Sequence, residues 1–180
     1  MNDVPQDVRD SMVIEAWMLI AERGLEGMST REVLARTGAP RGSVYHYFPR
    51  GRTQLIEQAI DRAQRWMSEQ IAAIEAQTPA EVIRGYVDIW RRVLETTDYR
   101  AGCAIVGLVS GAQEPDLLAR GATAFAAAAD GLAARFRIVQ LQQKLAPLDM
   151  VSFFDQQPFH GGADRGVRLK IVQRFNLAVG

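Results

Sequence analysis

The sequence predicts an all-α fold, because two strong helix-start signals and one very tight helix-helix junction organise it. Ser29 with Glu32, and Thr78-Pro79 with Glu81, are residue types that satisfy the free backbone N–H groups of a first helical turn. Apolar residues between these points recur at the period of a helix with one buried side. We expect a three-helix N-terminal unit, a long connecting helix, a second helical unit and an irregular C-terminal tail.

The first helix is expected to run from Asp7 to Arg23 and to end at Gly24, since glycine commonly terminates helices. The simplest role for its one tryptophan is in the core. Four apolar residues recur at helical spacing and should face inward: Val13, Ala16, Trp17 and Ile20.

The next two helices should form a helix-turn-helix. The second helix is expected to begin at about Thr30 and to end at Gly38, and Pro40 should occupy the first turn of a third helix that reaches about Tyr47. The turn would then cover only Thr37 to Ala39. A junction of three or four residues containing glycine is typical of this motif.

The third helix should carry polar groups outward. Val44 and Phe48 are four residues apart, so they share one face and should pack on the core. Between Met28 and Arg52 there are five arginines and one glutamate, an excess of four positive charges in a chain with a formal net charge of +0. The remaining side chains are left for the other faces: Arg41, Ser43, Tyr45, His46 and Tyr47.

The order of these residues resembles the DNA-binding domain of the tetracycline-repressor (TetR) family: Gly24, Ser29-Thr30, Gly38, Gly42, Val44-Tyr45, Phe48, and a basic residue before Leu55. The run GAPRGSVYHYFPRG is similar to the subgroup typified by lincomycin-resistance repressors. The resemblance extends from about Val8 to Trp66, weakens towards Phe136 and is absent afterwards. It implies a dimeric, ligand-responsive transcriptional repressor that binds double-stranded DNA.

These side chains are expected to contact different parts of the DNA, some the bases and others the phosphates. Arg41 suits base reading, since a guanidinium can bond two acceptors of guanine in the major groove. His46 could contact a base or a phosphate, or pack on the surface. Arg52 stands where the resembling family has a basic residue that meets a phosphate, and the alternative is a solvated arginine. Phosphate contacts are expected from Ser29, Thr30, Ser43, Tyr45 and Tyr47, with Gly42 inside the motif.

Beyond the motif, a long helix is expected from about Arg52 to Gln77, and another from Thr78 to about Asp98. The apolar run from Ala101 to Val109 favours a helix, and a further amphipathic helix should follow Pro115. We expect a DNA-binding domain at 1–66, a ligand-binding and dimerisation domain at 67–136, and a divergent segment at 137–180.

A small-molecule effector should bind in the second helical domain, where aromatic residues can line an apolar pocket or simply form core. An oxidant-sensing role for Cys103 is disfavoured, because no base or second thiol lies near it in the sequence. The candidate pocket residues are Trp66, Tyr86, Trp90, Tyr99, Cys103 and Phe125.

The tail weakens the expectation of a dimer. Pro147, Pro158, Gly161-Gly162 and Gly166 interrupt the region where the resembling family has its last two long helices. Val167, Leu169 and Ile171 alternate as in a strand.

Composition excludes several other classes. One cysteine allows no internal disulfide, two distant histidines offer no metal or catalytic arrangement, and we expect neither a cofactor nor an enzyme. The acidic N-terminus is unlike a signal peptide and no apolar run could span a membrane, so a cytoplasmic protein is expected. The alternative is a helix-turn-helix module that binds proteins and no operator.

Overall fold

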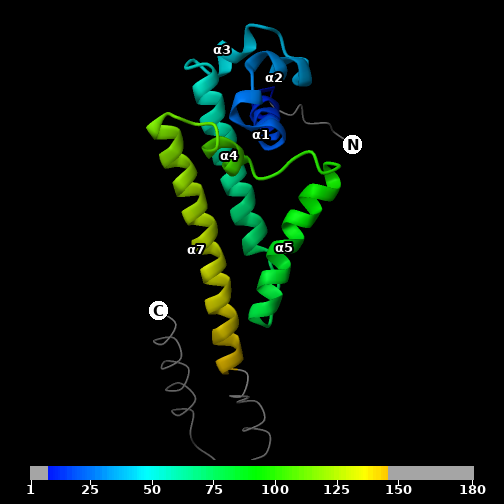
Figure 1. The fold of residues 1–180 in the computed structure, drawn as a ribbon, viewed down its shortest axis with the longest axis vertical. Coiled ribbons are helices and arrows are strands. Elements are labelled where there is room, and N and C mark those ends of the chain that lie inside the picture. Colours follow the sequence, from blue (N-terminus) through cyan, green and yellow to red (C-terminus); the bar gives the residue numbers. More distant parts are fainter. Residues whose placement is uncertain (1–7, 146–180) are drawn as a thin grey trace, which may run out of the picture. The chain divides into compact units, whose positions relative to one another are not determined.

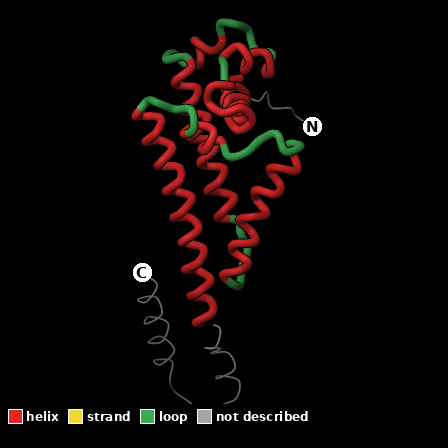
Figure 2. The backbone as a smooth tube through the Cα atoms, in the orientation of Figure 1, coloured by secondary structure: helices red, strands yellow, loops and turns green. Residues whose placement is uncertain are grey.

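The computed structural model describes residues 8–145, and all regular structure in that range is helical, which confirms the all-α prediction (Figures 1 and 2). Within these residues no helix is both long and apolar enough to cross a membrane. The helices are α1 (Val8–Gly27), α2 (Thr30–Thr37), α3 (Ser43–Tyr47), α4 (Arg52–Ala72), α5 (Pro79–Thr96), α6 (Ala104–Val109) and α7 (Pro115–Leu145).

The first helix is interrupted at Gly24, where the sequence predicts its end. The backbone there has φ 72°, a conformation that glycine adopts without steric cost, and helical structure resumes briefly as far as Gly27. α1 therefore consists of one long helix and one short turn.

The start and end of α2 agree with the prediction. Ser29 Oγ accepts the N–H of Glu32 at 3.2 Å, and Gly38 ends the helix in the left-handed conformation with φ 68°. The Glu32 carboxylate faces Arg23, with 3.5 Å between the Arg23 Nη1 and Glu32 Oε1 atoms. The serine half of the expected capping box is therefore present, and the glutamate side chain takes an ion-pair partner.

The expected start of the third helix at Pro40 is wrong, because α3 begins at Ser43. Pro40 accepts the Ser43 N–H at 2.9 Å, which closes a turn before the helix starts. Proline has a fixed φ and no N–H to donate, so it is compatible with a turn just before a helix as well as with a first helical turn, and its presence alone does not distinguish the two. The connection between α2 and α3 therefore extends to Gly42.

The long helix is shorter than expected. α4 ends at Ala72 and not near Gln77, because the chain turns so that the Ile74 N–H donates to the Ile71 carbonyl at 3.2 Å and the Ile74 side chain is buried. The predicted capping box of α5 is present, since Thr78 Oγ1 accepts the Glu81 N–H and the Glu81 carboxylate accepts the Thr78 N–H.

Buried residues form two clusters, and α4 contributes to both. The larger cluster joins α1 to α4 with α6 and the start of α7, and the smaller one is built on Ile71, Ile74 and Ile89. α6 lies directly on α1, so closely that a Cβ atom at Gly107 would be 2.5 Å from the Ile20 carbonyl oxygen. The second helical region therefore packs against the N-terminal helices without an intervening layer.

α7 continues to Leu145, beyond the residue near 136 at which the divergent tail was expected to begin. The predicted breaks from Pro147 onward and the alternation of Val167, Leu169 and Ile171 lie outside the described residues. The expected domain limits stay predictions.

Candidate nucleic-acid interface

α3 is fixed to the core by the face that the sequence predicts. Val44 and Phe48 are almost completely buried in the larger cluster, and the Phe48 N–H donates to the Val44 carbonyl at 2.7 Å. A helix of five residues has little stability of its own, so these two side chains supply most of what holds it in place. The opposite face of α3 is therefore held pointing away from the core.

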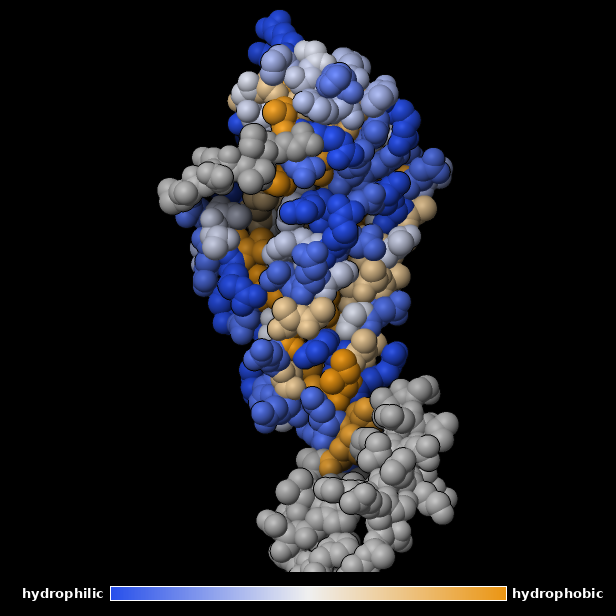
Figure 3. All heavy atoms as spheres, turned by 180° about the vertical axis from the view of Figure 1, so that it is seen from behind, coloured by the Kyte–Doolittle hydropathy of each residue, from blue (hydrophilic) through white to orange (hydrophobic). Residues whose placement is uncertain are grey.

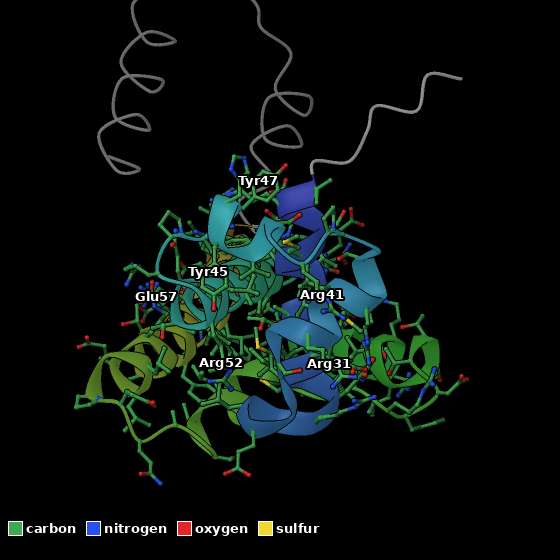
Figure 4. The ribbon with its side chains drawn as sticks, turned by 90° about the horizontal axis from the view of Figure 1, so that it is seen from above. Arg31, Arg41, Tyr45, Tyr47, Arg52 and Glu57 are labelled. Atoms are coloured by element: carbon green, nitrogen blue, oxygen red, sulfur yellow. The ribbon has the colours of Figure 1, made fainter. Side chains whose placement is uncertain are left out.

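That opposite face and the turn just before α3 carry the predicted contact residues. Tyr45 is 74% exposed, Arg41, Gly42 and His46 are exposed, and Ser43 is partly exposed. Tyr47 is partly buried, and its ring lies 4.8 Å from the His46 ring in an edge-on contact. Figure 4 shows Arg41, Tyr45 and Tyr47 at the end of the molecule formed by the N-terminal helices, together with Arg31 and Arg52.

Ion pairs neutralise part of the positive charge that the sequence concentrates here. Arg36 Nη2 is 2.6 Å from Glu22 Oε2, and Arg50 donates bidentately to Glu57. These hydrogen bonds raise the pKa of both arginines. Arg31 and Arg41 have no hydrogen-bond or ion-pair partner among the described residues, so their charge and their donors are free to meet a ligand.

Arg31 is a further candidate contact residue, for which the sequence analysis counted only the charge. It is exposed and lies in the first turn of α2, beside Ser29 and Thr30. Ser29 is exposed and Thr30 is partly exposed. The available signal was its position next to a helix N-terminus, where backbone N–H groups favour an anion.

Arg52 is exposed, but its guanidinium group is anchored to the backbone at the end of α1. Its Nε atom donates to the Met28 carbonyl at 3.1 Å, and its Nη2 atom donates to the Leu25 carbonyl at 2.8 Å. The side chain thus joins the start of α4 to the end of α1. The expected phosphate contact stays a prediction, and the structure adds a stabilising role that sequence spacing did not indicate.

Gly51 sets the angle between α3 and α4. It has φ 62° and ψ −136°, a region open to glycine and strained for other residues, and its N–H donates to the Phe48 carbonyl at 2.7 Å. A Cβ atom at Gly51 would also lie 3.6 Å from Cε1 of Tyr45. A Cβ atom at that distance makes an ordinary contact, so it is the backbone conformation of this tight turn that requires glycine.

A second feature is a partly open apolar cavity of about 280 Å³, lined by residues of α1, α4, α5 and α7 and by the residues around the start of α6. Five of the six predicted pocket residues line it: Trp66, Tyr86, Trp90, Cys103 and Phe125. Tyr99 is not among the lining residues and is 74% exposed, because it lies in the turn after α5 with φ 59°.

Trp17 also lines the cavity, although the sequence favours a core role for it. Its ring centroid lies 5.6 Å from that of Trp66, with the ring planes tilted by 52°. Helical periodicity places Trp17 on the inward side of α1, and it does not reveal that a hollow is present there. The cavity therefore touches a helix of the N-terminal unit.

The arrangement defines a class of protein. The short helix α3 is held by its buried face and presents a phenolic group outward, and Arg41 is exposed in the turn that joins α2 to α3. Ser29, at the N-terminus of α2, is exposed as well. This is the geometry of a helix-turn-helix that reads duplex DNA.

Comparisons with known proteins identify the family. Residues 15–59 match the model of bacterial regulatory proteins of the tetR family. The chain is 41% identical over 140 residues to the HTH-type transcriptional regulator Rv0196 of Mycobacterium tuberculosis, covering 73% of this chain and 70% of that relative. The chain therefore belongs to the TetR family of helix-turn-helix transcriptional regulators. This membership agrees with the expectation of a regulator and not an enzyme.

Other similarities are more partial. HTH-type transcriptional regulator LmrA of Bacillus subtilis is 32% identical over 83 residues, which cover 45% of this chain and 44% of LmrA. HTH-type transcriptional repressor DrrR1 of Streptomyces coeruleorubidus is 37% identical over 84 residues, 46% of this chain and 26% of that protein. A TetR-family regulator from Agrobacterium tumefaciens has the same fold, with a TM-score of 0.66, 21% identity, and coverage of 77% of this chain and 74% of its own.

Proposed function

We propose that the chain is a ligand-responsive repressor that binds a palindromic operator as a homodimer. The observation that carries this proposal is the unpaired, exposed Arg41 at the entrance to α3, a helix whose other face is locked by Val44 and Phe48. An exposed guanidinium whose donors are all free suits bidentate bonding to guanine. A repressor named DrrR1 among the similar proteins favours repression over activation.

The contacts divide into two kinds. Arg41 reads base edges, with His46 as a neighbouring base or phosphate contact. The exposed N-terminus of α2, with Ser29, Thr30 and Arg31, binds the backbone phosphates and fixes the register. Further phosphate contacts come from Ser43, Tyr45, Tyr47 and Arg52, with Gly42 allowing close approach of the backbone.

Dimerisation follows from the need for two readers on a two-fold site, with half-sites about 34–36 Å apart or a multiple of that distance. It is supported by apolar side chains exposed along α5 and α7, and apolar patches are visible in the lower half of the described surface in Figure 3. Examples are Ile83, Val87, Ile138 and Leu141. Light scattering coupled to size-exclusion chromatography should give twice the 20.0 kDa chain mass.

The run from Gly38 to Gly51 supports a place in the subgroup typified by lincomycin-resistance repressors. A protein that binds the chromosome in this way would work in the bacterial cytoplasm. The effector would bind in the apolar cavity and favour a conformation in which the two readers are wrongly spaced.

Selection of binding sites from random duplexes tests the proposal. The account expects enrichment of a sequence with two-fold symmetry, bound with an affinity that falls steeply as salt rises. A protein-interaction module on the same scaffold would enrich no sequence and would show no salt-dependent binding of duplex DNA. Either of those results contradicts operator binding.

A further inference from the structure

The cavity lining contains no charged side chain, although charged residues make up 23% of the chain. Two of its hydroxyl groups are already used within α5, since Thr96 Oγ1 donates to the Arg92 carbonyl and Thr97 Oγ1 donates to the Val93 carbonyl. Polar side chains that remain for a ligand include Gln64 and Tyr86. An ion placed here would lose part of its hydration without gaining a countercharge, so binding of an ion is unfavourable compared with binding of a neutral guest.

Aromatic side chains dominate the same cavity. The chain has three tryptophans, Trp17, Trp66 and Trp90, and all of them line it, together with Tyr86 and Phe125. Tilted and edge-on packing between rings stabilises an aromatic guest beyond the effect of burying its surface. The volume lies near the lower end of the range for small-molecule sites, which is roughly 300–1,000 Å³, so a compact guest is favoured.

One wall of the cavity belongs to α1. Trp17, Met18 and Ala21 all line it, and the Ala21 carbonyl also accepts the Gly102 N–H at 2.9 Å. The same helix holds α2 in place through Arg36, which lies 3.5 Å from Glu15 and 2.6 Å from Glu22. A guest that displaces Trp17 therefore acts on the helix that positions the DNA-binding motif.

We propose that the effector is an uncharged aromatic molecule of roughly two or three rings that contacts Trp17 directly and acts on the helix-turn-helix through α1. The regulatory half of this inference, that the effector changes DNA binding, rests on the proposed function. The other half, the chemical class of the ligand, does not depend on DNA binding and is tested without DNA.

The ligand class is tested with two dyes that share one aromatic skeleton. N-phenyl-1-naphthylamine is neutral, and 8-anilinonaphthalene-1-sulfonate adds a sulfonate. Each is titrated into the full chain while tryptophan emission is recorded, because all three tryptophans line the cavity and report its occupation. The neutral dye is expected to quench that emission and to bind at least about tenfold more tightly. Equal or tighter binding of the sulfonate, or no binding of either dye, overturns the assignment.

A matched pair on α7 locates the dye. Ala128 lines the cavity, whereas Ala126 is exposed and does not line it. Ala128→Phe should weaken binding of the neutral dye about tenfold by filling the space, and Ala126→Phe should leave it unchanged. Equal dye affinity in the two variants contradicts the location. Circular dichroism shows whether each variant is folded, and Ala128→Leu carries the test if the larger side chain is not accommodated.

The role of α1 is tested with the selected operator duplex. Saturating neutral dye should lower the operator affinity of the unaltered chain about tenfold or more. In Trp17→Leu, saturating dye should lower the operator affinity by less than about threefold. In Trp90→Leu, it should lower the operator affinity as much as in the unaltered chain. Trp17→Phe should also reduce this effect of the dye, and this variant serves if Trp17→Leu does not fold. If saturating dye still lowers the operator affinity about tenfold in both folded Trp17 variants, coupling through α1 is overturned. Failure to select any operator would instead count against the proposed function and leave the dye result standing.

Discussion

Arg36 of α2 and Glu22 of α1 form a two-pronged ion pair, with 2.6 Å between Nη2 and Oε2 and 3.3 Å between Nη1 and Oε1. Glu15 Oε2 also lies 3.5 Å from the guanidinium. The hydrogen bond from Arg36 is the main cause that lowers the pKa of Glu22 below 4.5. The pair joins the first helix of the motif to the helix behind it, so it should contribute to the stability of the DNA-binding unit.

Glu22→Gln should lower the free energy of unfolding by about 0.5–1 kcal/mol at neutral pH, the usual range for a pair near the surface. Because the pKa of Glu22 is lower in the folded chain than in the unfolded chain, this stability is present above pH 4.5 and is lost as the pH falls through the folded-state pKa. Chemical denaturation at several pH values measures it. Glu26→Gln, an exposed change on the same helix, is the control, and an equal effect there would contradict the prediction.

Arg52→Lys should lower the free energy of unfolding by about 1–2 kcal/mol while keeping the charge. Lysine cannot reproduce the two bonds that Nε and Nη2 donate to the Met28 and Leu25 carbonyls. Thermal unfolding measures the loss, with Arg62→Lys on the exposed side of α4 as the control. Unchanged stability together with weaker binding to all duplexes would leave Arg52 as a phosphate contact alone.

Local signals in the sequence located most of the helix boundaries. Ser29, Gly38 and the Thr78-Glu81 box act within a few residues of themselves, so their residue types were enough to predict the ends they form. Pro40 was misread because proline suits a turn as well as a helix start, and only the Ser43–Pro40 hydrogen bond distinguishes them.

The electrostatics of the candidate site could not be predicted in the same way. Glu22 is 14 residues from Arg36, and the Leu25 carbonyl is 27 residues from Arg52. Periodicity cannot pair residues at these separations, because the pairing depends on how α1, α2 and α4 pack. The same holds for Trp17, whose inward face was predictable and whose position beside a cavity was not.

Gly51→Ala should lower the free energy of unfolding by about 1–2 kcal/mol, since alanine is strained at φ 62°. Gly42→Ala is the matched change in the same motif. Gly42 has φ −76°, and a Cβ atom there would meet nothing within 4 Å, so that variant should be unchanged or slightly stabilised. Denaturant titration of both variants measures the difference. Similar losses would show that the conformation of Gly51 is not the cause.

Arg31→Ala should weaken binding to cognate and random duplexes by the same factor and lower the slope of log affinity against log salt by about one. The reason is that Arg31 is an unpaired cation at the N-terminus of α2, where phosphate contacts are expected. Fluorescence anisotropy at several salt concentrations measures the slope. A loss confined to the cognate duplex would assign Arg31 to base reading.

The most direct measurement of the central claim compares the unaltered chain and Arg41→Ala on the selected duplex and on a shuffled duplex of the same composition. Fluorescence anisotropy at one fixed salt concentration gives the four affinities. The account predicts that Arg41→Ala loses about 1–3 kcal/mol on the selected duplex and much less on the shuffled one, so that sequence preference collapses. Equal losses on both duplexes, or no loss on either, would contradict the claim that Arg41, in the turn before α3, reads DNA bases.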